Sequence, residues 1–160
     1  MKKAAVCFYS YSGNTRKIAL ALQKELSAQF QTDIIEIKAL DEADSFFGQC
    51  VRALRKKQAQ IKEDISLDVR DYDLIALGTP VWAFGMAPSM RTYMNKCTSF
   101  ESKDIIIFAT YGSGVGKDKC LNEMEKIAEG KSAKAVRRFL IQQNNTADEQ
   151  FVRSRIKEIL

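Results

Sequence analysis

Short apolar runs along the chain alternate with longer segments whose apolar residues recur every three or four positions. The short runs lie at residues 4–9, 33–37, 74–77, 105–109 and 135–141. Three of them are continuously apolar, which is typical of strands covered on both faces in a parallel sheet. We therefore predict five β-strands.

The segments between the strands have the periodicity of amphipathic helices. Asn14 and Thr15 can cap the start of the first helix. The helical apolar positions are Ile18, Leu22 and Leu26; Phe47, Val51, Leu54 and Ile61; Met90 and Met94; Leu121, Met124 and Ile127; and Val152, Ile156 and Ile159. Five strand–helix pairs, with no linker or repeat, predict one domain over residues 1–160. Its expected fold is a three-layer, doubly wound α/β sheet.

The composition excludes several classes of site. The chain has no histidine, which rules out Ser-His-Asp and Cys-His catalysis and most zinc enzymes. Cys7, Cys50, Cys97 and Cys120 are widely spaced, so they predict neither a disulfide framework nor a metal site. No apolar run approaches the roughly 20 residues needed to span a bilayer. We expect a soluble, cytoplasmic protein without a membrane partner.

The charge balance is basic, with 25 Lys and Arg against 20 Asp and Glu. Positive residues in 52–62 and the pair Arg137-Arg138 raise the possibility of a nucleic-acid-binding module. However, a net charge of +5 is modest, the charges fall on predicted helix faces, and no nucleic-acid motif is present. Solvated faces explain these charges better, so we expect no nucleic-acid partner.

Three loops follow the first, third and fourth predicted strands, where ligands bind in open α/β sheets. The first, residues 10–15, concentrates hydroxyl groups, an amide and a glycine at a helix N-terminus, which suits a phosphate. The second, residues 78–88, holds both prolines and the single tryptophan, Trp82, which we expect to face a ligand rather than the core. The third, residues 110–116, is rich in glycine but fits neither the Walker nor the dinucleotide pattern.

These loops resemble those of the flavodoxin family. Residues 10–15 are similar to its phosphate loop, Thr/Ser-x-Thr/Ser-Gly-Asn-Thr. Residues 78–82 resemble the loop that covers one face of the flavin, and residues 110–116 the loop around its pyrimidine edge. The resemblance covers essentially the whole chain. It implies strand order 2-1-3-4-5, the short-chain form of the fold, and one non-covalent FMN.

The resemblance also implies the residues of the cofactor site, with no catalytic side chain and no metal ligand among them. Ser10, Ser12, Asn14 and Thr15 would hold the phosphate, with backbone groups of Tyr11 and Gly13. The isoalloxazine would be lined by Thr79, Pro80, Val81, Trp82, Ala83, Phe84, Thr110, Tyr111, Gly112, Ser113 and Gly114. Trp82 and Tyr111 are the expected stacking residues.

Two functions remain open at this stage. One is an electron carrier that serves a redox partner protein or a small-molecule acceptor; the other is an NAD(P)H-dependent FMN or quinone reductase. The basic charge favours the reductase, because flavodoxins that carry electrons are usually acidic, but no nicotinamide motif is legible. The cations near the three loops, with Asp118 as the acidic neighbour, should stabilise a reduced, anionic cofactor. They are Arg16, Lys17, Arg91, Lys117 and Lys119.

Overall fold

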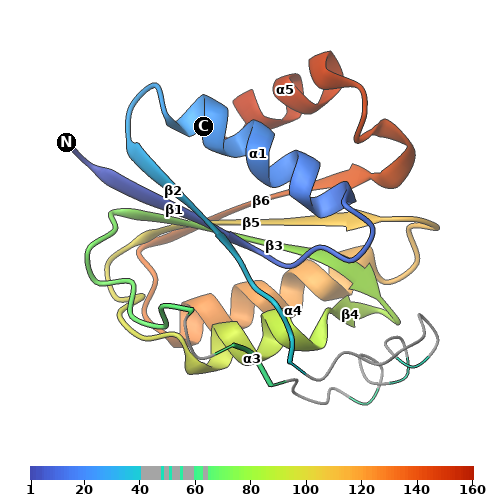
Figure 1. Cartoon of the computed structure of the whole chain (residues 1–160), viewed down its shortest axis with the longest axis horizontal. Helices are drawn as coiled ribbons and strands as arrows, with labels where there is room; N and C mark the ends of the chain where they lie inside the picture. The colour runs from blue at the N-terminus through green and yellow to red at the C-terminus, as the bar shows by residue number, and fades with distance from the viewer. Residues whose placement is uncertain (41–47, 49–50, 52–54, 56–59, 63–64) are drawn as a thin grey trace.

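Five parallel strands form the centre of the computed structural model (Figure 1). They are β1 (Lys3–Phe8), β2 (Gln31–Glu36), β3 (Leu74–Trp82), β5 (Asp104–Tyr111) and β6 (Ala135–Gln142). Their order is β2-β1-β3-β5-β6, which confirms the predicted order 2-1-3-4-5 when the parallel strands alone are counted. The structure describes the whole chain except residues 41–47, 49–50, 52–54, 56–59 and 63–64.

Helices cover both faces of the sheet (Figure 1). α1 (Asn14–Leu26) and α5 (Glu149–Lys157) lie on one face, and α3 (Pro88–Lys96) and α4 (Lys117–Gly130) on the other. Much of the predicted helix containing Phe47 and Leu54 lies outside the described residues. Among the helices that are described, none combines the length and the apolar character needed to cross a membrane.

The sheet separates two hydrophobic cores. Val6 and Phe8 of β1 pack toward α1 and α5, whereas Ala5 and Cys7 pack toward α3 and α4. Because successive side chains of a strand point to opposite faces, a strand covered on both sides needs an unbroken apolar run. β1 meets this requirement, since every residue from Ala4 to Phe8 is buried.

The segment predicted as a loop over residues 78–88 differs in the structure. β3 continues to Trp82 and turns back into a short antiparallel strand, β4 (Gly85–Met86), which the sequence analysis did not predict. Pairing of β1 with β3 ends at Phe8 and Gly78, so Pro80 lies beyond the end of β1. Pro80 still has Thr110 of β5 as its strand partner, and its missing N–H is tolerated because the ladder with β1 has already ended.

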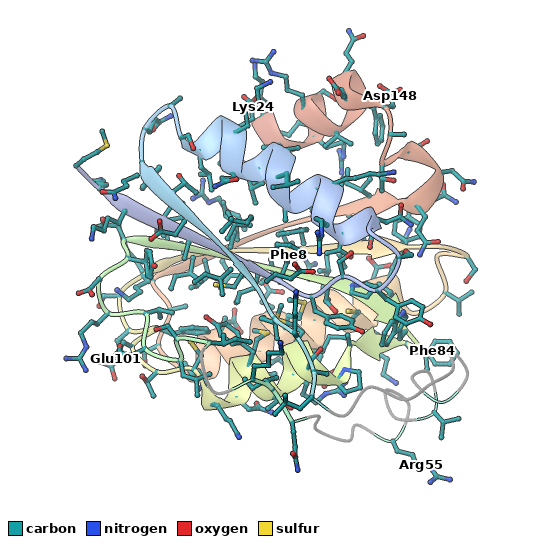
Figure 2. All side chains as sticks on the ribbon, viewed as in Figure 1. Phe8, Lys24, Arg55, Phe84, Glu101 and Asp148 are labelled. Carbon is teal, nitrogen blue, oxygen red and sulfur yellow. The ribbon has the colours of Figure 1, made fainter. Side chains whose placement is uncertain are left out.

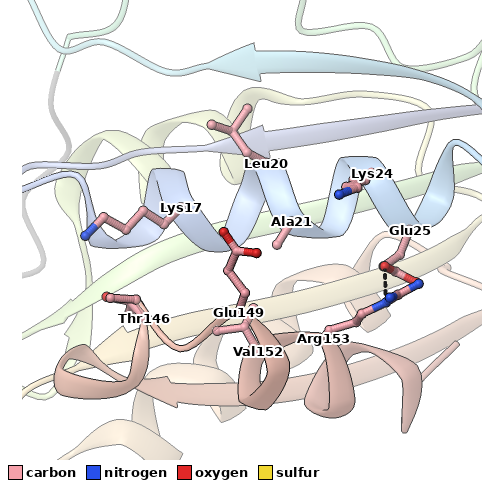
Figure 3. A pocket seen from close by; sticks show the side chains of 10 residues that line it. Lys17, Leu20, Ala21, Lys24, Glu25, Thr146, Glu149, Val152 and Arg153 are labelled. Carbon is pink, nitrogen blue, oxygen red and sulfur yellow. Dashed lines mark ion pairs between the residues drawn. The ribbon is translucent and has the colours of Figure 1, made fainter.

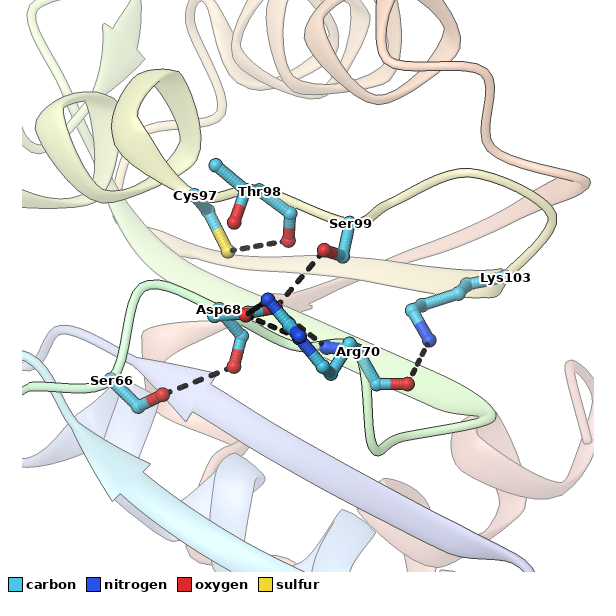
Figure 4. Close-up of polar contacts among 7 residues, drawn as sticks. All are labelled: Ser66, Asp68, Arg70, Cys97, Thr98, Ser99 and Lys103. Carbon is cyan, nitrogen blue, oxygen red and sulfur yellow. Dashed lines mark hydrogen bonds and ion pairs between the residues drawn. The ribbon is translucent and has the colours of Figure 1, made fainter.

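A polar cluster around Asp68 lies before the amino-terminal ends of β3 and β5 (Figure 4). Its Oδ1 accepts hydrogen bonds from the Arg70 N–H and from Ser99 Oγ, each at 3.0 Å. The Arg70 N–H is the main reason that the pKa of Asp68 lies below its usual value. This cluster ties the segment before β3 to the segment before β5, far from the three loops.

Three cysteines should be inert in the folded protein. Cys7, Cys97 and Cys120 are buried, and burial raises their pKa from 9.0 to about 12, 11 and 12 respectively. Because the thiolate is the reactive form, a native Cys50→Ser variant should not react with an aromatic disulfide reagent at about pH 8. Three thiols should react after unfolding in urea. Rapid reaction of the native variant would contradict this burial.

The same thiols predict how stability depends on pH. Each folded pKa lies above the unfolded value, so the unfolded state loses its protons first as the pH rises. The contribution of these protonated thiols to the free energy of unfolding is fully present below pH 9.0 and is lost progressively as the pH rises toward about 12. A Cys7→Ala variant should therefore show a flatter loss of unfolding free energy over this range in urea titrations. An equally steep loss would contradict the linkage.

Candidate functional site

Three connections meet at the carboxyl edge of the sheet, because β1, β3 and β5 are neighbours. In the structure the first loop covers residues 9–13 and the third loop residues 112–116, because the flanking strands and helices take up the other residues of the predicted loops. The second connection is the β3–β4 hairpin, with its turn at Ala83 and Phe84. The strand order reverses beside β1, at the position where open α/β sheets bind ligands. The structure thus brings the three predicted segments together.

The first loop leads directly into the N-terminus of α1. Gly13 is the N-cap residue, in the left-handed conformation with φ 90°, and it makes no side-chain capping hydrogen bond. Ser10 Oγ accepts from the N–H groups of Gly13 at 3.1 Å and Arg16 at 3.3 Å. Amide groups at a helix start attract anions, and a phosphate oxygen can take the place of the serine hydroxyl.

Asn14 is held by a residue that the sequence analysis missed. Thr146 follows the short 3-10 helix (Gln143–Asn145) after β6. Its Oγ1 shares its one hydrogen between the Gln143 carbonyl at 2.8 Å and Asn14 Oδ1 at 3.0 Å. The Asn14 amide in turn donates from Nδ2 to Ser12 Oγ at 3.2 Å. The polar run that follows β6 was the available signal. Its contact with the first loop depends on the fold.

A contact between Thr15 and Thr110 connects the first turn of α1 with the end of β5. Their hydroxyl oxygens lie 2.8 Å apart and both side chains are buried. Each hydroxyl can donate one hydrogen bond and accept others, so Thr15 keeps capacity for a further partner. In this structure it ties the N-terminus of α1 to the end of β5.

The β3–β4 hairpin has a two-residue turn in which Ala83 and Phe84 both have positive φ, 45° and 69°. This geometry matches the twist of the flanking strands. Thr79 Oγ1 accepts from the Ala87 N–H at 3.0 Å and closes the base of the hairpin. Thr79 and Pro80, which were predicted to line the flavin, are therefore buried within the strand.

Trp82 belongs to the core, which corrects the expectation that it faces away from it. It is 4% exposed, and the rings of Tyr9 and Tyr11 each lie 5.5 Å from it in edge-on geometry. The extension of β3 places the indole under the first loop. Phe84 at the tip of the hairpin (Figure 2) and Tyr11 instead present open rings, with 44% and 47% of their surface exposed.

The third loop contacts both neighbouring segments. Lys117 Nζ lies 5.1 Å from the centre of the Tyr111 ring, so a cation covers this predicted stacking residue. Gln142 Nε2 donates to the Gly112 carbonyl at 3.2 Å. A Cβ atom built on Gly116 would lie 2.5 Å from Phe84 Cα, so the loop and the hairpin touch at this glycine.

Ion pairs neutralise two of the five predicted cations. Arg16 pairs with Glu36 at the end of β2, and Arg91 pairs with Glu123 of α4 at 3.0 Å. Among the described residues no ion pair is recorded for Lys17, Lys117 or Lys119. The positive field at this edge is consequently weaker than the sequence suggested, because Glu36 and Glu123 are distant along the chain.

A separate groove of about 570 Å³ lies between α1 and α5 (Figure 3). Leu20, Ala21 and Val152 line it, and the Arg153–Glu25 ion pair, at 2.8 Å, closes one end. Lys17 and Thr146 lie on its wall and belong also to the surroundings of the first loop. The groove otherwise shares no residue with the three connections.

Comparison with known proteins gives one family. A family model described as Flavodoxin matches residues 3–150, which is most of the chain. No curated protein sequence matches the chain significantly.

Solved structures with the same fold cover nearly the whole chain. A protein from Bacteroides uniformis that is thought to be a flavoprotein is 19% identical, with a TM-score of 0.77 and 98% of each chain covered. Oxidised Flavodoxin 2 from Bacillus cereus is 15% identical, with a TM-score of 0.64 over 97% of this chain and 95% of that one. The apo form of an NADH:FMN oxidoreductase is 14% identical, with a TM-score of 0.66 over 98% and 88%. At these identities the likeness concerns the fold alone.

Proposed function

From the premise that the chain belongs to the flavodoxin family, we propose that it binds FMN at the three connections and carries electrons between redox partners. The observation that carries this proposal is the start of α1. Ser10 accepts from N–H groups at this helix start, Ser12 accepts from the Asn14 amide, and Tyr11 of the same loop lies against Trp82 of the hairpin. These groups fit a phosphate dianion.

The protein's own residues would then have three tasks. Ser10, Ser12 and Asn14 would bind the phosphate, with Thr146 orienting the Asn14 amide. Phe84 and the N–H groups of the third loop would orient the ring and exclude water from it. Bound FMN supplies the redox chemistry, because the isoalloxazine can take up or release one or two electrons.

The cofactor is tested by the visible spectrum of the purified protein. We expect the two absorption bands of a flavin and the release of FMN, rather than FAD or riboflavin, on denaturation. A protein that stays colourless after incubation with excess FMN would refute the proposal.

A reductase is the second candidate, and two observations favour it. The net charge of +5 is unlike that of acidic electron carriers, and one structural neighbour is an NADH:FMN oxidoreductase. Steady-state oxidation of NADH or NADPH by the FMN-loaded protein, with a quinone as acceptor, separates the two functions. Turnover without any further protein would establish the reductase, and no turnover would favour the carrier.

We predict that the exposed ring of Phe84 stacks on the bound flavin. An aromatic ring stacked on the flavin contributes about 0.5–1.5 kcal/mol, so Phe84→Ala should weaken FMN binding about two- to tenfold. It should also raise the fluorescence of the bound flavin. Phe151→Ala, which removes an exposed ring on α5, is the matched control. If Phe84→Ala leaves both values unchanged, Phe84 does not contact the flavin.

A further inference from the structure

A partly buried ion pair joins α3 to α4 beneath the β3–β4 hairpin, with the side chain of Glu123 20% exposed. Arg91 is 4% exposed, and its Nε donates to Glu123 Oε1 at 3.0 Å while Nη2 donates to Oε2 at 3.3 Å. This two-point geometry fixes the plane of the guanidinium group, which a single contact would not do. The sequence analysis named Arg91 only as a cation near the loops, and it gave Glu123 no part in the site.

The hairpin backbone lies directly on this pair. A Cβ atom built on Gly85 would lie 3.0 Å from Arg91 Nη2 and 3.4 Å from Glu123 Oε2. The first distance is shorter than most Cβ contacts, so a side chain at this position would require the guanidinium group to shift by a few tenths of an ångström. The guanidinium and carboxylate groups thus support the strand that follows the turn.

The turn itself requires support from its surroundings. Ala83 and Phe84 both occupy the left-handed region, which residues other than glycine rarely adopt. Such conformations persist where neighbouring structure holds them, and they are common around ligand sites. On one side the turn meets Gly116 of the third loop, and on the other the Arg91–Glu123 pair. The hairpin is therefore held between the residue that precedes α4 and an ion pair that joins α3 to α4.

Stability alone does not explain the pair. Among the described residues, Arg91 Nη1 is buried and has no hydrogen-bond partner, which is costly for a charged group. A buried ion pair can often be replaced by apolar residues without loss of stability. Within the described part of the chain, the Arg91–Glu123 pair leaves a buried donor without a partner, yet it supports a strained turn. The pair is therefore better explained by the position in which it holds the hairpin.

We propose that Arg91, held by Glu123, is a positioning residue that sets the β3–β4 hairpin for the flavin. The inference rests on the proposed FMN function, because the hairpin carries Phe84 into the candidate site. The pair acts through the backbone at Gly85 and does not itself touch the cofactor. Its removal should displace the hairpin and leave the rest of the sheet intact.

The central test is the double variant Arg91→Met with Glu123→Leu, which replaces the pair by apolar groups. Trp82 is the single tryptophan and adjoins the turn, so its emission reports the hairpin even without FMN. We expect red-shifted emission and stronger acrylamide quenching in the apoprotein, with an FMN Kd raised about tenfold. The urea midpoint should stay close to that of the wild type. Arg91→Lys, which keeps the charge but loses the two-point contact, should lie between the two.

Arg138→Met is the matched control, because it removes another ion pair of α4, with Glu125 at 2.9 Å, on the side facing β6. It should leave Trp82 emission and FMN affinity unchanged. Wild-type emission and Kd in the double variant would overturn the proposal, as would affinity losses that merely follow losses of stability in all variants. If the wild type binds no FMN, the proposed function fails, whereas the emission of Trp82 still tests the hairpin.

Discussion

Riboflavin should bind this protein at least about a hundredfold more weakly than FMN. The reason is the start of α1, where backbone N–H groups lie beside the hydroxyls of Ser10 and Ser12 and the Asn14 amide. A hydrogen bond to a charged group contributes about 1.5–3 kcal/mol, so two of them correspond to a hundredfold or more in Kd. Fluorescence titration of the apoprotein with each ligand measures the ratio. Equal affinities would show that the loop does not hold the phosphate.

Ser12→Ala isolates one of these hydrogen bonds. It should weaken FMN binding about tenfold and leave riboflavin binding unchanged, because riboflavin has no phosphate. Ser12 is a cleaner target than Thr15, whose hydroxyl bonds to Thr110 in the interior. Ser154→Ala on α5 serves as the control for loss of an exposed hydroxyl. A Ser12 variant that loses affinity for both ligands equally would indicate a distorted loop instead.

Replacing Gly116 by alanine should strongly damage the site. Gly116 has φ 79°, and the new Cβ would lie 2.5 Å from the Cα of Phe84. The backbone conformation alone costs about 1–2 kcal/mol for a residue with a Cβ, and the overlap with backbone atoms adds to it. We expect a lower urea midpoint and an FMN Kd raised by about tenfold or more.

The matched control is Gly130→Ala at the end of the same helix. A Cβ at Gly130 would meet no atom within 4 Å, so this variant should be neutral or slightly stabilising. Trp82 emission should change in the Gly116 variant and stay constant in the Gly130 variant. Wild-type stability and affinity for Gly116→Ala would mean that the third loop can move away from the hairpin freely.

The alternation of strands and helices could be predicted because each element leaves a local signature, whereas the order of the strands in the sheet came from the family resemblance. An apolar run that is covered on both faces, such as Ala4 to Phe8, is followed by a segment of helical periodicity, and this alternation repeats along the chain. The loop that we propose binds the phosphate could be identified for a similar reason. Its hydroxyls, its glycine and the helix it begins are contiguous in the sequence, from Ser10 to Thr15.

The hairpin was harder to predict because the glycine and proline content of residues 78–88 indicates a loop, whereas strand pairing extends through this segment. Pro80, Gly78 and Gly85 are typical of a loop, yet β3 continues through them because β1 has ended and β4 can pair with Trp82. The position of the indole follows from this extension. Trp82 is therefore covered by Tyr9 and Tyr11, where the sequence suggested an open stacking surface.

By itself the sequence determined the layers of the fold, the strand order through its family resemblance, and the edge of the sheet where three connections meet. Only the tertiary structure shows which side chains from distant parts of the chain support the three connections. Arg91 and Glu123 are 32 residues apart, and Thr146 reaches Asn14 across 132 residues. Periodicity describes which face of an element is apolar, but a hydrogen bond between distant residues depends on how the packed elements align. For this reason the supports of the site became visible only in the folded chain.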